Sequence, residues 1–133
     1  MEDNRPTVMI VDDDALIRET CKEYLEERGY TVIVAENGRR ALQNLQKQNV
    51  DAMFLDILMP EKEGIETLRE VKRMQPSLRV YVMSGGGSAK LDIFLDIAMK
   101  FGADGRLSKP FTPEDMVRLL RAPNRVAASG PIA

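Results

Sequence analysis

The chain alternates short apolar runs with longer amphipathic stretches, and this alternation constrains its fold more than any other feature. The five runs are rich in Val, Ile and Met, and they cover residues 7–11, 31–35, 51–55, 79–83 and, more weakly, 105–108. Most of the runs are apolar throughout instead of alternating with polar residues. Continuous apolarity is typical of strands that are covered on both faces of a parallel sheet.

Five stretches with helical periodicity lie between and after these runs, at residues 15–29, 37–49, 64–74, 88–102 and 112–121. Asn37 is placed to cap the second stretch, and Thr112 with Pro113 is a strong start signal for the fifth. Gly29 and Gly102 are placed to end the first and the fourth. Strict alternation of strand and helix predicts an α/β fold, with a doubly wound five-stranded parallel sheet and helices on both faces.

The composition narrows the class of protein. A chain of 133 residues with a net charge of −2 suits one domain and gives no electrostatic footprint for nucleic acid or an anionic membrane. The absence of His and the single Cys21 exclude a His or Cys metal cage and an internal disulfide. No apolar run approaches the ~18–20 residues of a membrane span, and the polar start is unlike a signal peptide. We therefore expect a cytoplasmic domain over residues 1–121 and a flexible tail over 122–133.

Polar residues follow the apolar runs where the predicted strands end. An acidic triplet at residues 12–14 follows the first run, Asp56 the third, Ser84 the fourth and Lys109 the fifth. The carboxyl ends of parallel strands meet at one edge of a sheet, so these side chains should converge. Converging carboxylates repel one another unless a cation lies among them, and an oxygen-only set of ligands suits Mg²⁺.

This set of groups is suited to phosphoryl chemistry. The Asp56 carboxylate can attack a phosphorus atom and form an acyl phosphate. Mg²⁺ and Lys109 would neutralise charge on the transferring oxygens. Ser84 is placed to donate a hydrogen bond to a phosphoryl oxygen, and the glycines at 85–87 leave the backbone there free to move towards it.

Four stretches carry a resemblance to a known family: VMIVDDD (8–14), FLDILMP followed by EG (54–64), VMSGG (82–86) and GADGRLSKPF (102–111). Together, in this order and spacing, they resemble the receiver domain of two-component response regulators over roughly residues 5–121. The resemblance implies a flavodoxin-like (βα)5 fold with strand order 2-1-3-4-5.

The resemblance also implies a metal site and a phosphoacceptor. Asp56 corresponds to the phosphoacceptor, and the implied Mg²⁺ ligands are Asp12, Asp13, Asp56 and the backbone of Ile57. Taken alone, Asp12 or Asp13 would fit an acidic helix cap equally well. Asp14 is better placed for that capping role or for solvent.

The remaining correspondences concern signalling. Ser84 lies where the family has its switch hydroxyl, and Lys109 where it has its active-site lysine, with Pro110 expected after a cis peptide bond. The implied partners are a histidine kinase or a histidine phosphotransfer protein that donates the phosphoryl group, and an unknown downstream protein. The chain would then be a signalling protein and not an enzyme.

Two positions bear on partners. Arg106 stands where many receivers carry an aromatic switch residue, so an aromatic flip cannot be the readout, and the implied output surface lies on the fourth and fifth helices beside Arg106. Leu16 lies off the buried stripe of the first helix and is either a docking contact for the phosphoryl donor or a scattered exposed residue.

After Phe111 only residues 112–133 remain, too few for a DNA-reading module, so we expect a stand-alone receiver or one cut from a longer protein.

Two other classes of protein fit part of the pattern. A phosphatase of the haloacid dehalogenase type also uses an Asp nucleophile with Mg²⁺, but it needs a second Asp two residues on, where this chain has Leu58. A flavodoxin-like nucleotide or flavin binder needs a phosphate-binding loop after the first strand. The acidic triplet at 12–14 would repel phosphate there.

Overall fold

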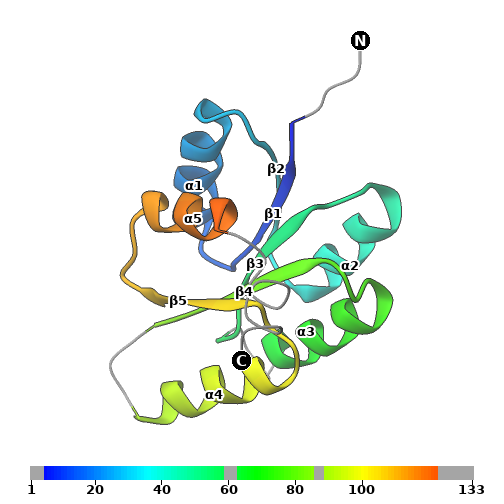
Figure 1. Cartoon of the computed structure of the whole chain (residues 1–133), viewed down its shortest axis with the longest axis vertical. Coiled ribbons are helices and arrows are strands. Elements are labelled where there is room, and N and C mark those ends of the chain that lie inside the picture. Colours follow the sequence, from blue (N-terminus) through cyan, green and yellow to red (C-terminus); the bar gives the residue numbers. More distant parts are fainter. Residues whose placement is uncertain (1–4, 59–62, 86–88, 123–133) are drawn as a thin grey trace.

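A computed structural model describes residues 5–58, 63–85 and 89–122 and shows one parallel sheet (Figure 1). The strands lie in the order β2-β1-β3-β4-β5, which confirms the predicted order and fold class. Their bounds are Thr7–Val11 for β1, Thr31–Ala35 for β2, Ala52–Asp56 for β3, Arg79–Gly85 for β4 and Gly105–Lys109 for β5.

Five helices cover the two faces of this sheet. Their bounds are Ala15–Glu27 for α1, Gly38–Lys47 for α2, Glu63–Met74 for α3, Ala89–Lys100 for α4 and Pro113–Arg121 for α5. Helices α1 and α5 lie on one face, and α2, α3 and α4 lie on the other (Figure 1). In the described part of the chain, no helix is long and apolar enough to cross a membrane.

Alternate residues of each central strand enter different cores. The core under α2, α3 and α4 includes Met9, Val11, Met53, Leu55, Leu45, Leu68, Val71, Leu95 and Ala98. The core under α1 and α5 includes Val8, Ile10, Phe54, Met83, Cys21, Leu25, Met116, Val117 and Leu120. Both faces of β1 and β3 are therefore buried, which explains why their sequences are apolar without alternation.

The predicted helix boundaries are confirmed where a capping residue defines them. The Asn37 side chain accepts a hydrogen bond from the Arg40 N–H at 2.9 Å. Thr112 and Asp115 form a reciprocal capping box at the start of α5. Gly29 and Gly102, which follow α1 and α4, have φ angles of +96° and +104° that a side chain would strain.

Three strands have bounds that differ from the prediction by one or two residues, and the difference places the polar residues on the sheet itself. β3 runs over 52–56 instead of 51–55, because Ala52 pairs with Val8 of β1 and Asp56 with Met83 of β4. Likewise, β4 extends to Gly85 and β5 to Lys109. Asp56, Ser84 and Lys109 are thus held on strands rather than on the loops beyond them.

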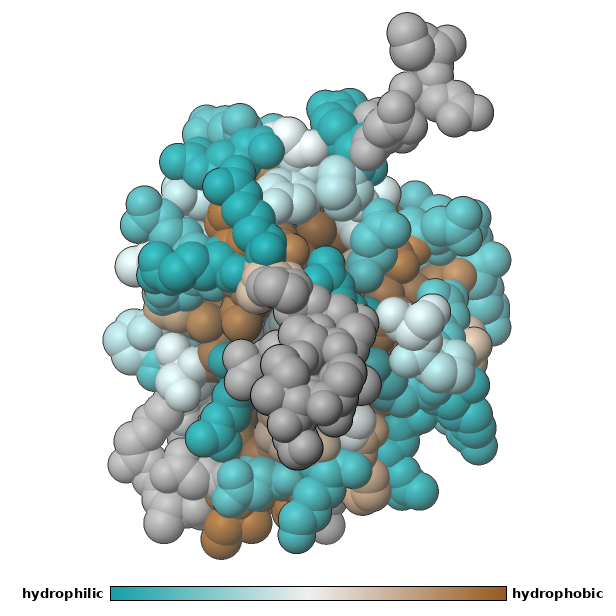
Figure 2. Space-filling model, in the orientation of Figure 1, coloured by the Kyte–Doolittle hydropathy of each residue, from teal (hydrophilic) through white to brown (hydrophobic). Residues whose placement is uncertain are grey.

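Helix α4 exposes more apolar surface than its sequence pattern predicts. The helical pattern over residues 88–102 places Met99 on the inward face, but Met99 is 39% exposed. Ile93 is 57% exposed, and Phe101, which follows α4, is 41% exposed. Hydrophobic residues reach the surface over α4 at the lower edge of the molecule in Figure 2. Among the α4 side chains whose burial the structure describes, Leu95 and Ala98 are buried in the core on this face, and Phe94 packs against it partly buried.

Candidate functional site at the carboxyl end of the sheet

The turn between β1 and α1 holds the first two acids. The Asp12 side chain is completely buried, its backbone N–H donates to the Ala35 carbonyl at 3.1 Å, and its Oδ1 accepts from the Asp14 N–H at 2.9 Å. Asp14 caps α1 by accepting from the Leu16 N–H at 2.9 Å. Because Asp14 serves as the cap, the carboxylates of Asp12 and the exposed Asp13 are not needed for it.

Asp56 is the last residue of β3 and is 4% exposed. Its Oδ1 accepts a hydrogen bond from the Leu58 N–H at 2.9 Å, and the Ile57 N–H donates to the Met83 carbonyl at 3.0 Å. The start of α3 packs directly on this backbone, since a Cβ added at Gly64 would lie 2.3 Å from the Ile57 Cα. Any side chain at Gly64 would therefore displace the segment that carries the Asp56 carboxylate.

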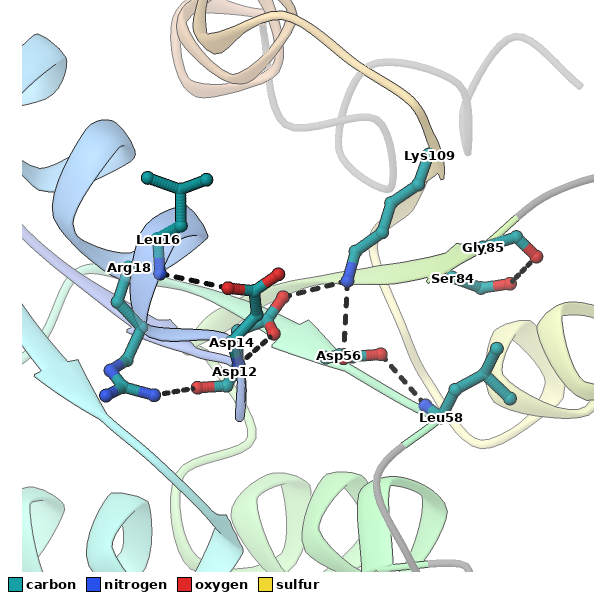
Figure 3. A network of polar contacts seen from close by, with 9 residues as sticks. All are labelled: Asp12, Asp14, Leu16, Arg18, Asp56, Leu58, Ser84, Gly85 and Lys109. Atoms are coloured by element: carbon teal, nitrogen blue, oxygen red, sulfur yellow. Dashed lines mark hydrogen bonds and ion pairs between the residues drawn. The ribbon is translucent and has the colours of Figure 1, made fainter.

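Lys109, the last residue of β5, reaches across to both buried acids (Figure 3). Its Nζ lies 3.0 Å from Asp12 Oδ2 and 3.4 Å from Asp56 Oδ2. The Lys109–Pro110 peptide bond is cis, as predicted. The structure therefore brings Asp12, Asp56 and Lys109 together from three different strand ends.

The charges in this site are not balanced. Burial raises the pKa of the Asp56 carboxyl above its usual value, although the Leu58 N–H and the Lys109 charge act to lower it. Burial alone would lower the pKa of Lys109, but the hydrogen bond to Asp12 and the charges of both carboxylates outweigh it and raise that pKa. One ammonium group is thus shared between two buried carboxylates.

Three carboxylates are close enough to share a metal ion. Oxygen atoms of Asp12, Asp13 and Asp56 lie within 4.8 Å of one another. The donors are all oxygen, which is the donor type that Mg²⁺ prefers, and the buried carboxylates of Asp12 and Asp56 share the Lys109 ammonium. The residues present therefore fit a hard divalent ion. The part expected of the Ile57 backbone stays a prediction.

Ser84 is placed near the acids but is not bonded to them. It is completely buried near the end of β4, and its hydroxyl donates to the neighbouring Gly85 carbonyl at 3.2 Å (Figure 3). A hydroxyl rotates about one bond, so this hydrogen bond does not fix the direction of the Ser84 hydroxyl, and its expected role as the switch hydroxyl stays a prediction. Gly86 and Gly87, whose backbone was expected to move towards a phosphoryl group, lie outside the described residues.

Two contacts near the site were not predicted from the sequence. The Arg18 guanidinium donates to the Asp12 carbonyl at 2.8 Å. Arg106 forms an exposed ion pair with Asp96 of α4 at 3.2 Å. The Arg18 contact could have been predicted from the sequence, because Arg18 lies one turn beyond the capped start of α1. The Arg106–Asp96 contact could not, because helical periodicity did not indicate that Asp96 faces β5.

A groove runs beside the site between α1 and the start of α5. It has a volume of about 510 Å³, and its lining includes Leu16, Ile17, Lys109, Phe111 and Pro113. Leu16 is 72% exposed at this groove, which fits its prediction as a residue off the buried stripe. The apolar lining of the groove thus lies next to Lys109, at the edge of the acidic site.

The fold and the site together define a flavodoxin-like domain with an acidic pocket at the carboxyl end of its parallel sheet. Residues 8–121 match the model of the response regulator receiver domain, and the chain belongs to this family. This match confirms the resemblance that the sequence motifs indicated. Receiver domains are signalling modules of two-component systems.

Several known proteins are similar to the chain. The transcriptional regulatory protein CpxR of Escherichia coli (strain K12) is 37% identical over 115 residues, which cover 86% of this chain and 47% of that protein. The chain therefore spans about half the length of the curated relatives it matches.

Among solved structures, a CheY-like receiver domain protein from Methanospirillum hungatei JF-1 has a TM-score of 0.80 at 25% identity and covers 98% of this chain and 100% of its own. A response regulator from Burkholderia pseudomallei, solved with a phosphorylated aspartic acid, a calcium ion and citrate, has a TM-score of 0.78 at 25% identity. That match covers 95% of this chain and 72% of the other.

Proposed function

We propose that this receiver accepts a phosphoryl group on Asp56 from a phosphohistidine, with Mg²⁺ bound by Asp12, Asp13 and Asp56. The donor is a histidine kinase or a histidine phosphotransfer protein, and the output is contact with a downstream protein. The observation that carries the proposal is the convergence of the buried Asp56 carboxylate with Asp12, Asp13 and Lys109. The phosphorylated aspartic acid in the Burkholderia pseudomallei regulator supports it.

In the proposed reaction, an Asp56 carboxylate oxygen forms a bond to phosphorus while the bond from phosphorus to the donor's imidazole nitrogen breaks. The electron pair of that bond leaves with the imidazole. Bound Mg²⁺ would supply charge neutralisation for the phosphoryl oxygens. The Leu58 N–H holds one Asp56 oxygen, and Lys109 stabilises negative charge on the other side. Ser84 then turns to donate to a phosphoryl oxygen.

The chain should take up one phosphoryl group from acetyl phosphate when Mg²⁺ is present. Intact-mass measurement with Mg²⁺ and with a chelator tests this in wild type, in Asp56→Asn and in Asp51→Asn. Asp51 is the control, since it flanks the other end of β3 and its exposed carboxylate accepts a hydrogen bond from the Thr7 N–H at 2.7 Å, away from Lys109. Labelling that survives Asp56→Asn would sink the assignment.

The phosphatase alternative does not gain support from the structure. The position that would need a general-acid carboxylate holds Leu58, whose side chain is 37% exposed. A leucine cannot protonate a leaving group. No observation on the described residues favours this function over phosphoryl acceptance.

The apolar groove beside Lys109 is the proposed docking place of the phosphoryl donor. A donor histidine must reach Asp56, and the groove joins Leu16, Phe111 and Pro113 to Lys109 on that approach. Leu16→Asp should slow transfer from a cognate kinase and leave labelling by acetyl phosphate unchanged. Ile93→Asp is the matched control, since Ile93 is an exposed apolar residue on α4. Transfer that is equally fast in Leu16→Asp and in this control would rule out the docking role.

The downstream protein is proposed to bind α4 and α5 around Arg106. Exposed Ile93 and Phe101 and the Arg106–Asp96 ion pair support this choice of surface. The stand-alone organisation, the receiver limits of 1–121 with a tail over 122–133, and the cytoplasmic location stay predictions.

A further inference from the structure

The Arg18 side chain ties the first helix to the end of the first strand. Its Nη1 lies 2.8 Å from the Asp12 carbonyl oxygen, in a partly buried setting. The Arg18 backbone N–H donates to the Asp14 carbonyl at 3.1 Å. One residue therefore holds two carbonyls of the turn that carries the acids.

These contacts close a ring around the turn (Figure 3). Asp12 Oδ1 accepts from the Asp14 N–H, Asp14 Oδ1 accepts from the Leu16 N–H, and Arg18 returns to the Asp12 carbonyl. The side-chain bond of Arg18 is the step that closes the ring. Without it, the turn keeps the Asp14 cap and the contacts of Asp12 to Ala35 and Lys109, but it loses the tie from the α1 side chain to the end of β1.

The choice of acceptor matters for metal binding. Lys109 occupies one oxygen each of Asp12 and Asp56, whereas Arg18 bonds to a backbone carbonyl. The guanidinium thus brings a positive charge to the acidic turn without taking up a carboxylate oxygen. The carboxylate oxygens therefore stay available to a cation, and a gain in its affinity comes from ordering of the turn, because the guanidinium charge by itself repels the ion.

We propose that Arg18 is a positioning residue for the acid pair Asp12 and Asp13, and that it preorganises the turn for Mg²⁺. The proposal rests on the proposed function of the site. A residue that orients metal ligands from outside the ligand set acts on affinity, because ligands that must first be ordered bind more weakly. Arg18 does not contact the phosphoryl group in this role.

The test compares wild type with Arg18→Met, Arg18→Gln and the control Lys22→Met. Lys22 lies one turn further along α1 and pairs with Glu26 at 2.5 Å, away from the site, and its replacement removes the same charge. Mg²⁺ affinity is measured by titration calorimetry on the unphosphorylated proteins, and hydrogen exchange is followed at the Asp14 amide.

Both Arg18 variants should bind Mg²⁺ about 10-fold more weakly than the control. Their Asp14 amide should exchange faster, and their labelling rate at saturating Mg²⁺ should stay near that of wild type. An Mg²⁺ affinity equal to that of Lys22→Met in a folded Arg18 variant would overturn the proposal. If Arg18→Met does not fold, as judged by circular dichroism, Arg18→Gln decides, since its polar amide is tolerated at a half-buried site.

Failure of this inference is distinguishable from failure of the proposed function. If wild type binds Mg²⁺ but is not labelled at Asp56, the proposed function fails while the calorimetry still decides the role of Arg18. If wild type is labelled and the Arg18 variants match the control in affinity and exchange, only the inference about Arg18 fails.

Discussion

The sheet carries a lysine–aspartate cluster at each end, and the two clusters differ in charge balance more than in burial. The amino-end cluster consists of Lys72 and Asp104, whose side chains are 16% and 18% exposed. The carboxyl-end cluster consists of Lys109, Asp12 and Asp56, whose side chains are 23%, 0% and 5% exposed.

In the amino-end cluster every charge has a fixed partner. Lys72 Nζ lies 2.7 Å from Asp104 Oδ2 and 2.7 Å from the Leu78 carbonyl oxygen. The same Asp104 oxygen accepts from the Val80 N–H at 2.9 Å. One cation faces one anion, and the pair fastens α3 to the amino ends of β4 and β5.

In the carboxyl-end cluster one cation faces two buried anions, and the exposed Asp13 adds a third carboxylate nearby. Burial raises the pKa of Asp56 here despite the neighbouring ammonium. The same two residue types thus give a satisfied fastening at one end of the sheet and an unbalanced site at the other. In this molecule, the charge imbalance at the carboxyl end, and not the presence of an ion pair, marks that cluster as the candidate functional site.

Replacing each of the two lysines by methionine should give the largest difference between the clusters. Lys109→Met should slow the labelling of Asp56 by acetyl phosphate by about 10²-fold at saturating Mg²⁺, because it removes charge stabilisation from the transferring group. Lys72→Met should leave the labelling rate near that of wild type but lower the free energy of unfolding by about 1–3 kcal/mol, since Asp104 loses its cation. Labelling kinetics and urea unfolding measure the two effects.

A comparable loss of labelling rate in both folded variants would contradict this division of roles. It would mean that the amino-end cluster also sets the geometry around Asp56.

The contrast between the clusters also explains which parts of the site the sequence predicted. Asp12, Asp56 and Lys109 each stand where an apolar run stops, and parallel strands bring such positions to one edge. Lys72 and Asp104 have no such signal, because Lys72 lies within a helical pattern and Asp104 precedes a weak strand. Their contact depends on how the end of α3 packs beneath β4 and β5.

Side-chain rotamers and the limits of the strands likewise could not be predicted from the sequence pattern. The hydroxyl of Ser84 bonds to the Gly85 carbonyl in this structure, and an apolar run does not report a side-chain torsion. The run at 51–55 did not show that Asp51 lies outside β3, since the pairing of Ala52 with Val8 determines the register. The helical period places Met99 inwards, but Met99 is 39% exposed, because a period does not report how deeply a side chain is buried.

Mg²⁺ should stabilise the carboxyl-end cluster and have no effect through the amino-end cluster. An ion that binds the folded state alone adds about 1.4 kcal/mol to the free energy of unfolding at ten times its Kd. That increment corresponds to a melting temperature higher by about 3–5 °C in a domain of this size. Asp13→Asn should lose most of the increment, because one carboxylate of the ion's ligand set is gone.

Asp104→Asn is the control for this measurement. It should start from a lower melting temperature than wild type, since Lys72 loses its anion, yet gain the full increment on addition of Mg²⁺. A wild-type melting temperature that is indifferent to millimolar Mg²⁺ would count against the metal site.

Replacing Asp56 in the carboxyl-end cluster and Asp104 in the amino-end cluster should change the free energy of unfolding in opposite directions, and we expect this to be the smallest effect. Because burial raises the pKa of Asp56 in the folded state, that state holds its proton to a higher pH than the unfolded state does. Stability therefore falls as pH rises from the usual Asp value to the raised one, and it stays lower above that window. Asp56→Asn removes this loss and should be slightly more stable than wild type at neutral pH without Mg²⁺, whereas Asp104→Asn should be less stable.

The advantage of Asp56→Asn should shrink on acidification below the usual Asp pKa, where the wild-type carboxyl is protonated in both states. Urea unfolding of the three proteins at neutral and acid pH measures these differences, and an Asp56→Asn variant that is destabilised at neutral pH would show that Lys109 already balances the carboxyl-end cluster.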